Sequence, residues 1–260
     1  MRVIAMKLAA LSESRNRRYR DAMPSTPQEA ELLRLLEAHE IMRLIPIESL
    51  RTLIRRAGLL TYPERDEIFG QGDPGRTVLV VVEGYVKLSV TMLSGREVVL
   101  DLAEPGNVIG EIAVLNEWPR AATATALSAC TLLAIDGRSF TRELLGAPQA
   151  MLAIIRLLSQ RLRKTTAQVT ENLELPAPVR LAKALIELAA LHSRPTPQGP
   201  QIGLPLSQRE LGAMTGLIRE SINRHLGTWR DAGWIGLTEG TITLCNIGAL
   251  RALLLEHDIE

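Results

Sequence analysis

One short segment of the chain, residues 110–123, combines residue types that could hold a phosphorylated sugar. Gly110 lets the backbone approach a ligand closely and adopt conformations that other residues avoid. The carboxylate of Glu111 can accept hydrogen bonds from sugar hydroxyls. The guanidinium of Arg120 offers a bidentate fork that suits a phosphate, and exposed backbone amides can add further donors. The segment therefore predicts a site for an anion joined to a sugar.

A second segment further along the chain has the sequence pattern of two short helices joined by a tight turn. Ser207 followed by Glu210 forms a capping box, and Gly216 allows the turn. Ile222 and Leu226, at i and i+4, anchor the second helix to a core. The charged residues on its free face are Arg219, Glu220 and Arg224. Arginine reads guanine in the DNA major groove and glutamate accepts a hydrogen bond from cytosine, so this face predicts DNA contact. The alternative is a solvated surface helix.

The first segment must be positioned by a small β-structure, since short β-rich runs alternate with glycines between residues 60 and 135. We expect a barrel or roll from the runs Val78–Val82, Val86–Val90, Val98–Leu102 and Thr131–Ile135. Before it, residues 29–57 predict helix, split at Pro46.

After the roll, residues 139–173 predict one long helix with a heptad seam. Apolar residues and one threonine recur at spacings of four and three: Met151, Ile155, Leu158, Leu162, Thr165 and Val169. Such a seam favours a two-helix coiled coil between two copies of the chain, while the alternative is a helix packed on its own domain. Pro176 and Pro178 end this helix. Beyond them we expect a helix over 179–191, a loop over 192–205, two short helices within 206–234, a hairpin over 235–244 and a helix over 247–255.

Composition excludes several other classes of protein. The 260 residues carry 30 Lys+Arg against 29 Asp+Glu, which is not the charge of a protein that coats nucleic acid. Two cysteines cannot form a disulfide scaffold or a four-thiolate metal site, and four scattered histidines show no catalytic or metal spacing. No apolar run is long enough to cross a membrane, and no secretory signal is recognisable. We therefore expect a cytoplasmic protein that is not an enzyme, with no catalytic residues and no metal.

Residues 110–123 resemble the phosphate-binding cassette of cyclic-nucleotide-binding domains, and the ending Pro119-Arg-Ala-Ala-Thr123 resembles that of cAMP-dependent kinase regulatory subunits. The resemblance implies that Glu111 holds the ribose 2′-OH and that Arg120 pairs with the cyclic phosphate. It also assigns Gly110, Ile112 and Ala121 to the ligand site. Ala121 offers no hydroxyl to a guanine, which favours cAMP over cGMP as the effector.

Thr165 and Thr166 fall where bacterial cAMP receptor proteins place a Thr-Ser pair that touches the purine. The resemblance implies that these hydroxyls read the adenine, one from each subunit of the dimer. The alternative is that Thr165 only sets the register of a coiled coil.

Residues 206–226 resemble the helix-turn-helix of the cAMP receptor protein and fumarate-nitrate regulator (Crp/Fnr) family. The resemblance implies that Arg219 and Arg224 read guanines and that Glu220 reads a cytosine, in a TGTGA-like half-site repeated as a palindrome. Ser207, Gln208 and Ser221 are its candidate phosphate contacts.

These observations predict an α+β fold in four parts. They are a flexible N-terminal extension (1–27), a jelly-roll-like cyclic-nucleotide-binding β-roll (28–140), a dimerisation helix (141–175) and a winged helix-turn-helix (176–260). We expect a homodimer that binds cAMP or cGMP and double-stranded DNA, with RNA polymerase as a further partner. The alternatives are a family member with another ligand or none, and a regulatory subunit that does not bind DNA.

Overall fold

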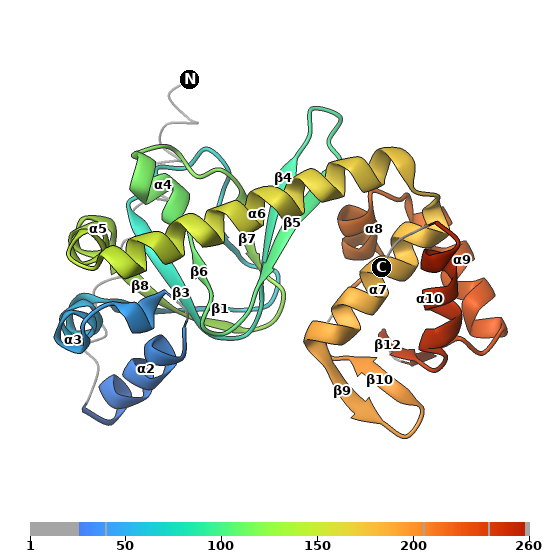
Figure 1. Cartoon of the computed structure of the whole chain (residues 1–260), viewed down its shortest axis with the longest axis horizontal. Helices are drawn as coiled ribbons and strands as arrows, with labels where there is room; N and C mark the ends of the chain where they lie inside the picture. The colour runs from blue at the N-terminus through green and yellow to red at the C-terminus, as the bar shows by residue number, and fades with distance from the viewer. Residues whose placement is uncertain (1–25, 40, 205, 239, 258–260) are drawn as a thin grey trace. The chain divides into compact units, whose positions relative to one another are not determined.

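The structure is a computed structural model that describes residues 26–39, 41–204, 206–238 and 240–257 (Figure 1). The extension expected over residues 1–27 lies outside the described residues, except for Thr26 and Pro27, which begin a helix. The chain divides into two compact units. The first contains the residues up to Leu88 together with Leu102–Ser159, and the second contains Ser89–Asp101 and the residues from Gln160 onward.

The helices and strands before the long helix follow one another in this order: α2 (Thr26–Ala38), a 3-10 turn η1 (Met42–Leu44), α3 (Ile47–Arg56), β1 (Gly58–Tyr62), β2 (Glu67–Phe69), β3 (Thr77–Glu83), β4 (Val86–Thr91), β5 (Glu97–Ala103), β6 (Val108–Ile109), α4 (Glu111–Asn116), β7 (Thr123–Ala126), β8 (Cys130–Asp136) and α5 (Gly137–Leu145). The strands form two four-stranded sheets, in the orders β1-β8-β3-β6 and β2-β7-β4-β5. The predicted roll is confirmed, and so is the break near Pro46, which precedes α3.

Strand β3 is buried on both of its faces because it separates two apolar clusters. Side chains alternate between the faces of a strand. Val78 and Val80 therefore pack with the helices, in a cluster that also holds Phe140 of α5. Leu79 and Val81 point the other way and pack against residues of the second sheet. This double burial fixes the register of β3 against its neighbours, and with it the ends of the loops that carry the residues predicted to bind the ligand.

The single helix expected over residues 139–173 is wrong, because the structure has two helices there. Helix α5 ends at Leu145, and α6 (Pro148–Glu174) begins two residues after Gly146. Pro148 has no backbone N–H and clashes with a preceding helical turn, so it starts a helix but cannot continue one. The heptad residues all lie on α6.

The second unit contains the later part of α6 and these further elements: α7 (Ala177–His192), β9 (Ser193–Thr196), β10 (Gly199–Ile202), α8 (Gln208–Thr215), α9 (Arg219–Asp231), β11 (Ile235–Thr238), β12 (Thr241–Leu244) and α10 (Ile247–Leu255). Its sheet has the order β11-β12-β10-β9. The helices expected over 179–191 and 247–255 and the hairpin over 235–244 are confirmed.

The prediction of a loop over residues 192–205 is wrong, because this segment forms the β9–β10 hairpin. Strand β10 pairs with β12 through Gln201 and Thr243, far apart in the sequence. The Gln201 side-chain amide also donates to the hydroxyls of Thr241 and Thr243, at 3.2 and 3.4 Å. The composition of a proline- and glycine-rich segment does not predict such strand pairing, because contacts with distant parts of the chain decide it.

None of the helices in the described part of the chain has the length and apolarity needed to cross a membrane.

We predict that Phe140→Ala lowers the free energy of unfolding by about 3–5 kcal/mol, because Phe140 is fully buried and its removal leaves a cavity. Urea unfolding followed by circular dichroism measures the change. Leu145→Ala on the same helix is the matched control, since Leu145 is exposed. Its effect should stay within about 0.5 kcal/mol. A Phe140→Ala variant as stable as this control would contradict the assigned core.

Candidate functional site

The first site is built around the side chain of Arg120, which is only 5% exposed. Its Nη1 donates to the carbonyl oxygen of Gly110 at 2.9 Å. Its Nη2 donates to the carbonyl and the hydroxyl of Thr77, at 2.8 and 3.0 Å. The guanidinium carbon lies 4.3 Å from the centre of the Phe69 ring, a cation–π arrangement. The hydrogen-bond acceptors named here are all neutral and satisfy only part of its donor capacity.

The electrostatics of this enclosure favour an anion. Burial lowers the pKa of Arg120, while the nearby carboxylates of Glu111 and Asp73 oppose the shift. Its Nε is buried and has no hydrogen-bond partner among the described residues. Burying a charge without full compensation is costly, so a bound anion that paired with the guanidinium would relieve the site.

Close backbone packing places the loop before β3 against the cassette. The amide of Gly72 donates to the carbonyl of Arg120, and the amide of Arg120 donates to the carbonyl of Asp73, at 2.9 and 2.8 Å. A Cβ on Gly75 would lie 2.2 Å from the Cβ of Ala113 on α4, so only glycine fits there. Gly110 has φ +81° and a Cβ at this position would meet Nη1 of Arg120 at 2.1 Å, so it also needs to be glycine.

The structure brings together Gly110, Glu111 and Arg120 from the predicted ligand set. Glu111 is the first residue of α4 and is 1% exposed, while Ile112 after it is half-buried. Ala121 is exposed. Sequence analysis missed Phe69 and Thr77, which contact the Arg120 side chain, and Asp73, whose carbonyl accepts from the Arg120 amide and whose carboxylate lies near the guanidinium. The sequence indicated a loop here only through the glycines between Phe69 and Thr77.

Thr165 and Thr166, the other two predicted ligand residues, lie on the part of α6 that belongs to the second unit. Both are exposed. The hydroxyl of Thr170 donates to the carbonyl of Thr166 at 3.2 Å, while the Thr165 and Thr166 side chains face outward. They remain accessible to a ligand or to a second copy of the chain.

The second site is the helix pair α8–α9, whose predicted cap and turn are confirmed. The amide of Glu210 donates to the Ser207 hydroxyl at 3.3 Å, and the amide of Ser207 donates to the Glu210 carboxylate at 2.6 Å. Gly216 ends α8 with φ +68°, and a Cβ there would meet Oδ1 of Asn172 at 2.8 Å. The turn glycine therefore also lets α8 pack close to the end of α6.

Helix α9 has one buried face and one exposed face, as its sequence predicts. Ile222, Leu226 and Trp229 are buried. The predicted base-reading residues all lie on the exposed side: Arg219, Glu220 and Arg224. The predicted phosphate contacts differ in accessibility: Ser207 is exposed but holds the cap, while Gln208 and Ser221 are half-buried.

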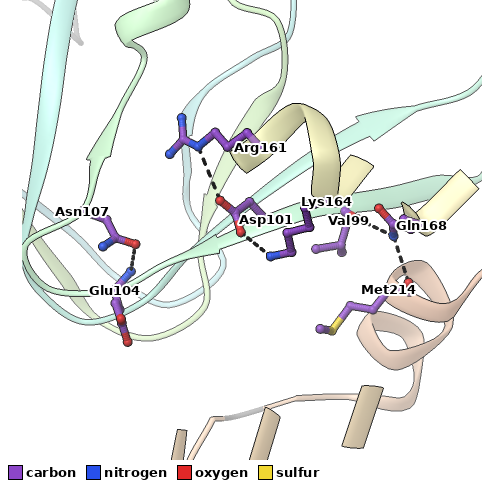
Figure 2. Close-up of polar contacts among 8 residues, drawn as sticks. All are labelled: Val99, Asp101, Glu104, Asn107, Arg161, Lys164, Gln168 and Met214. Carbon is purple, nitrogen blue, oxygen red and sulfur yellow. Dashed lines mark hydrogen bonds and ion pairs between the residues drawn. The ribbon is translucent and has the colours of Figure 1, made fainter. Parts of the chain in front are cut away.

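A polar face of β5 meets one face of α6 within the second unit (Figure 2). The Gln168 side-chain nitrogen donates to the carbonyl of Val99 at 3.1 Å and to the carbonyl of Met214 on α8 at 3.0 Å. Asp101, two residues after Val99 and on the same strand face, pairs with Lys164 at 2.6 Å and with Arg161 at 3.6 Å. One amide nitrogen thus links three elements: β5, α6 and α8.

Figure 2 also shows how the turn after β5 is closed: Oδ1 of Asn107 accepts a hydrogen bond from the amide of Glu104 at 3.2 Å. The amide of Asn107 donates back to the carbonyl of Glu104 at 2.9 Å. Either an asparagine or an aspartate can accept the first of these bonds. Asn107 therefore has a structural role in this turn.

Fold and sites together define a class of protein, a regulator that combines a β-roll, in which a buried arginine suits an anion, with a helix-turn-helix whose second helix exposes two arginines. Comparison with known proteins agrees. Residues 59–147 match the family of cyclic nucleotide-binding domains, and residues 179–253 match the Crp-like helix-turn-helix domain.

Curated relatives cover most of the chain. The cyclic AMP receptor protein of Thermus thermophilus is 32% identical over 74% of this chain and 86% of its own. The CRP-like cAMP-activated global transcriptional regulator of Mycobacterium tuberculosis is 25% identical over 73% of this chain and 84% of its own. Among solved structures, the c-di-GMP responsive regulator CLP of Xanthomonas campestris is 26% identical with a TM-score of 0.67, over 76% of this chain and 99% of that one.

The chain belongs to the Crp/Fnr family of transcription regulators. It is a cyclic-nucleotide-binding and DNA-binding regulator and not an enzyme.

We predict that Gln168→Glu loosens the junction of β5, α6 and α8, because it replaces the donor with an acceptor that faces two carbonyl oxygens. Leaving such groups unpaired costs about 1–3 kcal/mol. Hydrogen exchange should speed up in residues 97–103 and 208–215, and remain unchanged in the β9–β10 hairpin. Gln160→Glu, an exposed position on the same helix, is the matched control. Unchanged exchange at both segments would mean that the Gln168 contacts do not hold this junction.

Proposed function

We propose that the chain is a homodimeric transcription regulator whose affinity for a TGTGA-like palindrome is raised by a cyclic nucleotide, cAMP before cGMP. The observation that carries the ligand part is the enclosed guanidinium of Arg120, with its buried and unpartnered Nε. A cyclic phosphate can take over donors that now face the carbonyls of Gly110 and Thr77. The carboxylate of Glu111, next to Gly110, would then accept a hydrogen bond from the ribose 2′-OH.

The choice of cAMP rests on two further points. Ala121 carries no hydroxyl that could bind the amino group of a guanine. Two of the relatives described above are a cyclic AMP receptor protein and a cAMP-activated regulator. In this proposal Ile112 and Ala121 line the ligand, and Thr165 and Thr166 read the adenine.

The homodimer is supported by the exposure of the heptad seam on α6. Ile155, Leu162 and Val169 are more than half exposed in the single chain, and none of the six seam residues is buried. Exposed apolar residues at heptad spacing are what a parallel helix partner covers. In this proposal α6 (Pro148–Glu174), which lies within the expected range 141–175, is the dimerisation helix between the ligand-binding part (28–140) and the DNA-binding part (176–260).

The DNA part of the proposal assigns guanine reading to Arg219 and Arg224 and cytosine reading to Glu220. Ser207, Gln208 and Ser221 contact phosphates, which position the protein without reading sequence. The cyclic nucleotide acts by binding the DNA-competent state better than the other state. RNA polymerase is a further proposed partner, and action on DNA implies a cytoplasmic protein.

A second candidate is a family member that responds to another ligand. One observation favours it, namely the similarity to a regulator described as c-di-GMP responsive. The same alternative includes a family member that binds DNA without responding to any ligand. A regulatory subunit without DNA binding is the remaining alternative, and the exposed base-reading face of α9 argues against it.

We predict that fluorescence anisotropy of a labelled duplex, carrying two inverted TGTGA half-sites about one helical turn apart, reports tighter binding with cAMP than without it. The titration is run at one fixed salt concentration, without nucleotide, with cAMP, with cGMP and with c-di-GMP. Arg120→Lys keeps the charge but loses the fork, so the cAMP concentration that gives a half-maximal response should rise at least tenfold.

The control for folding is the nucleotide-free affinity for the same duplex, which Arg120→Lys should leave unchanged. A response of Arg120→Lys equal to that of the wild type would overturn the ligand site. Tightening by c-di-GMP alone would favour the second candidate. Tight binding that ignores every nucleotide would favour the ligand-independent one.

We also predict that Arg224→Ala relaxes the preference for guanine at one position of each half-site, because a bidentate arginine–guanine contact contributes about 1–3 kcal/mol of discrimination. Competition with duplexes changed at single base pairs measures it. An equal loss of affinity across all sequences would instead mark Arg224 as a phosphate contact. Arg251→Ala, an exposed arginine on α10, is the matched control.

A further inference from the structure

The exposed face of α9 holds one polar residue to which the family resemblance gives no role. Asn223 is exposed and lies four residues after Arg219 and three after Glu220. Residues at these spacings are neighbours on one helix face. The Asn223 side chain therefore lies among the groups proposed to read DNA bases.

Asn223 has no structural role that the described part of the chain reveals. None of the hydrogen bonds found among the described residues uses its side-chain amide, and it caps neither end of α9. Asparagine is also a weaker helix former than alanine or the long polar residues. Nothing in the described part of the chain therefore calls for an asparagine at this position of α9.

A second residue on the same side of α9 supports this reasoning. Gly227 lies one turn after Asn223, in the interior of the helix, where glycine is less stable than alanine. A Cβ at position 227 would have no heavy atom within 4 Å, so packing within the chain does not require glycine there. Because position 227 has no side chain, a second molecule can approach the helix backbone more closely there.

We propose that Asn223 reads an adenine in the major groove, through a bidentate contact to N6 and N7, and that Gly227 lets α9 lie deep enough for this contact. Asparagine matches the donor and acceptor pattern of adenine as arginine matches that of guanine. The half-site then contains one adenine–thymine pair specified by Asn223, in addition to the pairs assigned to Arg219, Glu220 and Arg224. This inference rests on the proposed DNA binding and deepens it.

The first test is selection of binding sites from random duplexes by the full-length wild-type protein and by Asn223→Ala, with and without cAMP. The wild type should select a palindrome with an adenine at one symmetric position, preferred by about 5- to 150-fold over other bases. Asn223→Ala should lose that preference and keep the preferences at the other positions. Arg251→Ala, an exposed residue on α10 outside the helix pair, is the matched control and should select the wild-type sequence.

The second test removes single atoms from the DNA. Replacing the selected adenine by 7-deazaadenine deletes its N7 acceptor, which should weaken wild-type binding several-fold and leave Asn223→Ala binding unchanged. Gly227→Ala should raise the melting temperature of the protein and yet weaken its binding to the selected duplex. If Gly227 had only a structural role, its substitution would not raise the melting temperature and weaken DNA binding at the same time.

The outcomes distinguish this inference from the proposed function. If the wild type selects a palindrome and Asn223→Ala selects the same bases at every position, Asn223 does not read a base and the inference is wrong. If 7-deazaadenine weakens both proteins equally, another residue contacts that adenine. If the wild type selects no sequence under either condition, the proposed DNA site fails together with the inference.

Discussion

The burial of the Arg120 guanidinium is the interaction on which the ligand site depends. A cation that is 5% exposed stays in the fold because the carboxylates of Glu111 and Asp73 lie near, and because two backbone carbonyls, one hydroxyl and an aromatic face surround it. These partners come from β2, β3 and the turn before α4, which are distant in the sequence. The loop before β3 must therefore pack closely on the cassette, and that closeness requires glycine at positions 75 and 110. The same incomplete compensation makes an anion a favourable partner for the site.

The DNA-binding helix satisfies two requirements with its two faces. The buried face, with Ile222, Leu226 and Trp229, holds α9 in its domain through apolar packing. The exposed face is not optimised for helix stability, since it carries Asn223 and Gly227 where better helix formers would be tolerated. Departures from local preference of this kind are expected where a surface serves recognition. Both features fit the base-reading role proposed for this face.

Sequence patterns predicted most elements but missed contacts between them. Strands β3, β4, β5 and β8, the capping box at Ser207 and the helices on both sides of Pro46 follow from local preferences, so they were predicted correctly, whereas the short strands β1, β2, β6 and β7 were not predicted. The β9–β10 hairpin was missed because β10 depends on pairing with β12. The break before Pro148 was missed because the apolar periodicity continues across it. The role of Gln168 in joining β5 to α8 could not be predicted from the sequence, because its partners are backbone carbonyls, which every residue has.

The sequence by itself determined the order of the parts, the cassette with Gly110, Glu111 and Arg120, and the charged face of α9. These are local properties of residue type and spacing, which do not depend on the rest of the chain. Only the tertiary structure decided that Phe69 and Thr77 enclose the guanidinium, and that Asn223 is exposed together with Arg219 and Arg224. The physical reason is that burial and exposure are set by the packing of segments far apart in sequence, and it is burial that decides what a charged or polar side chain can bind.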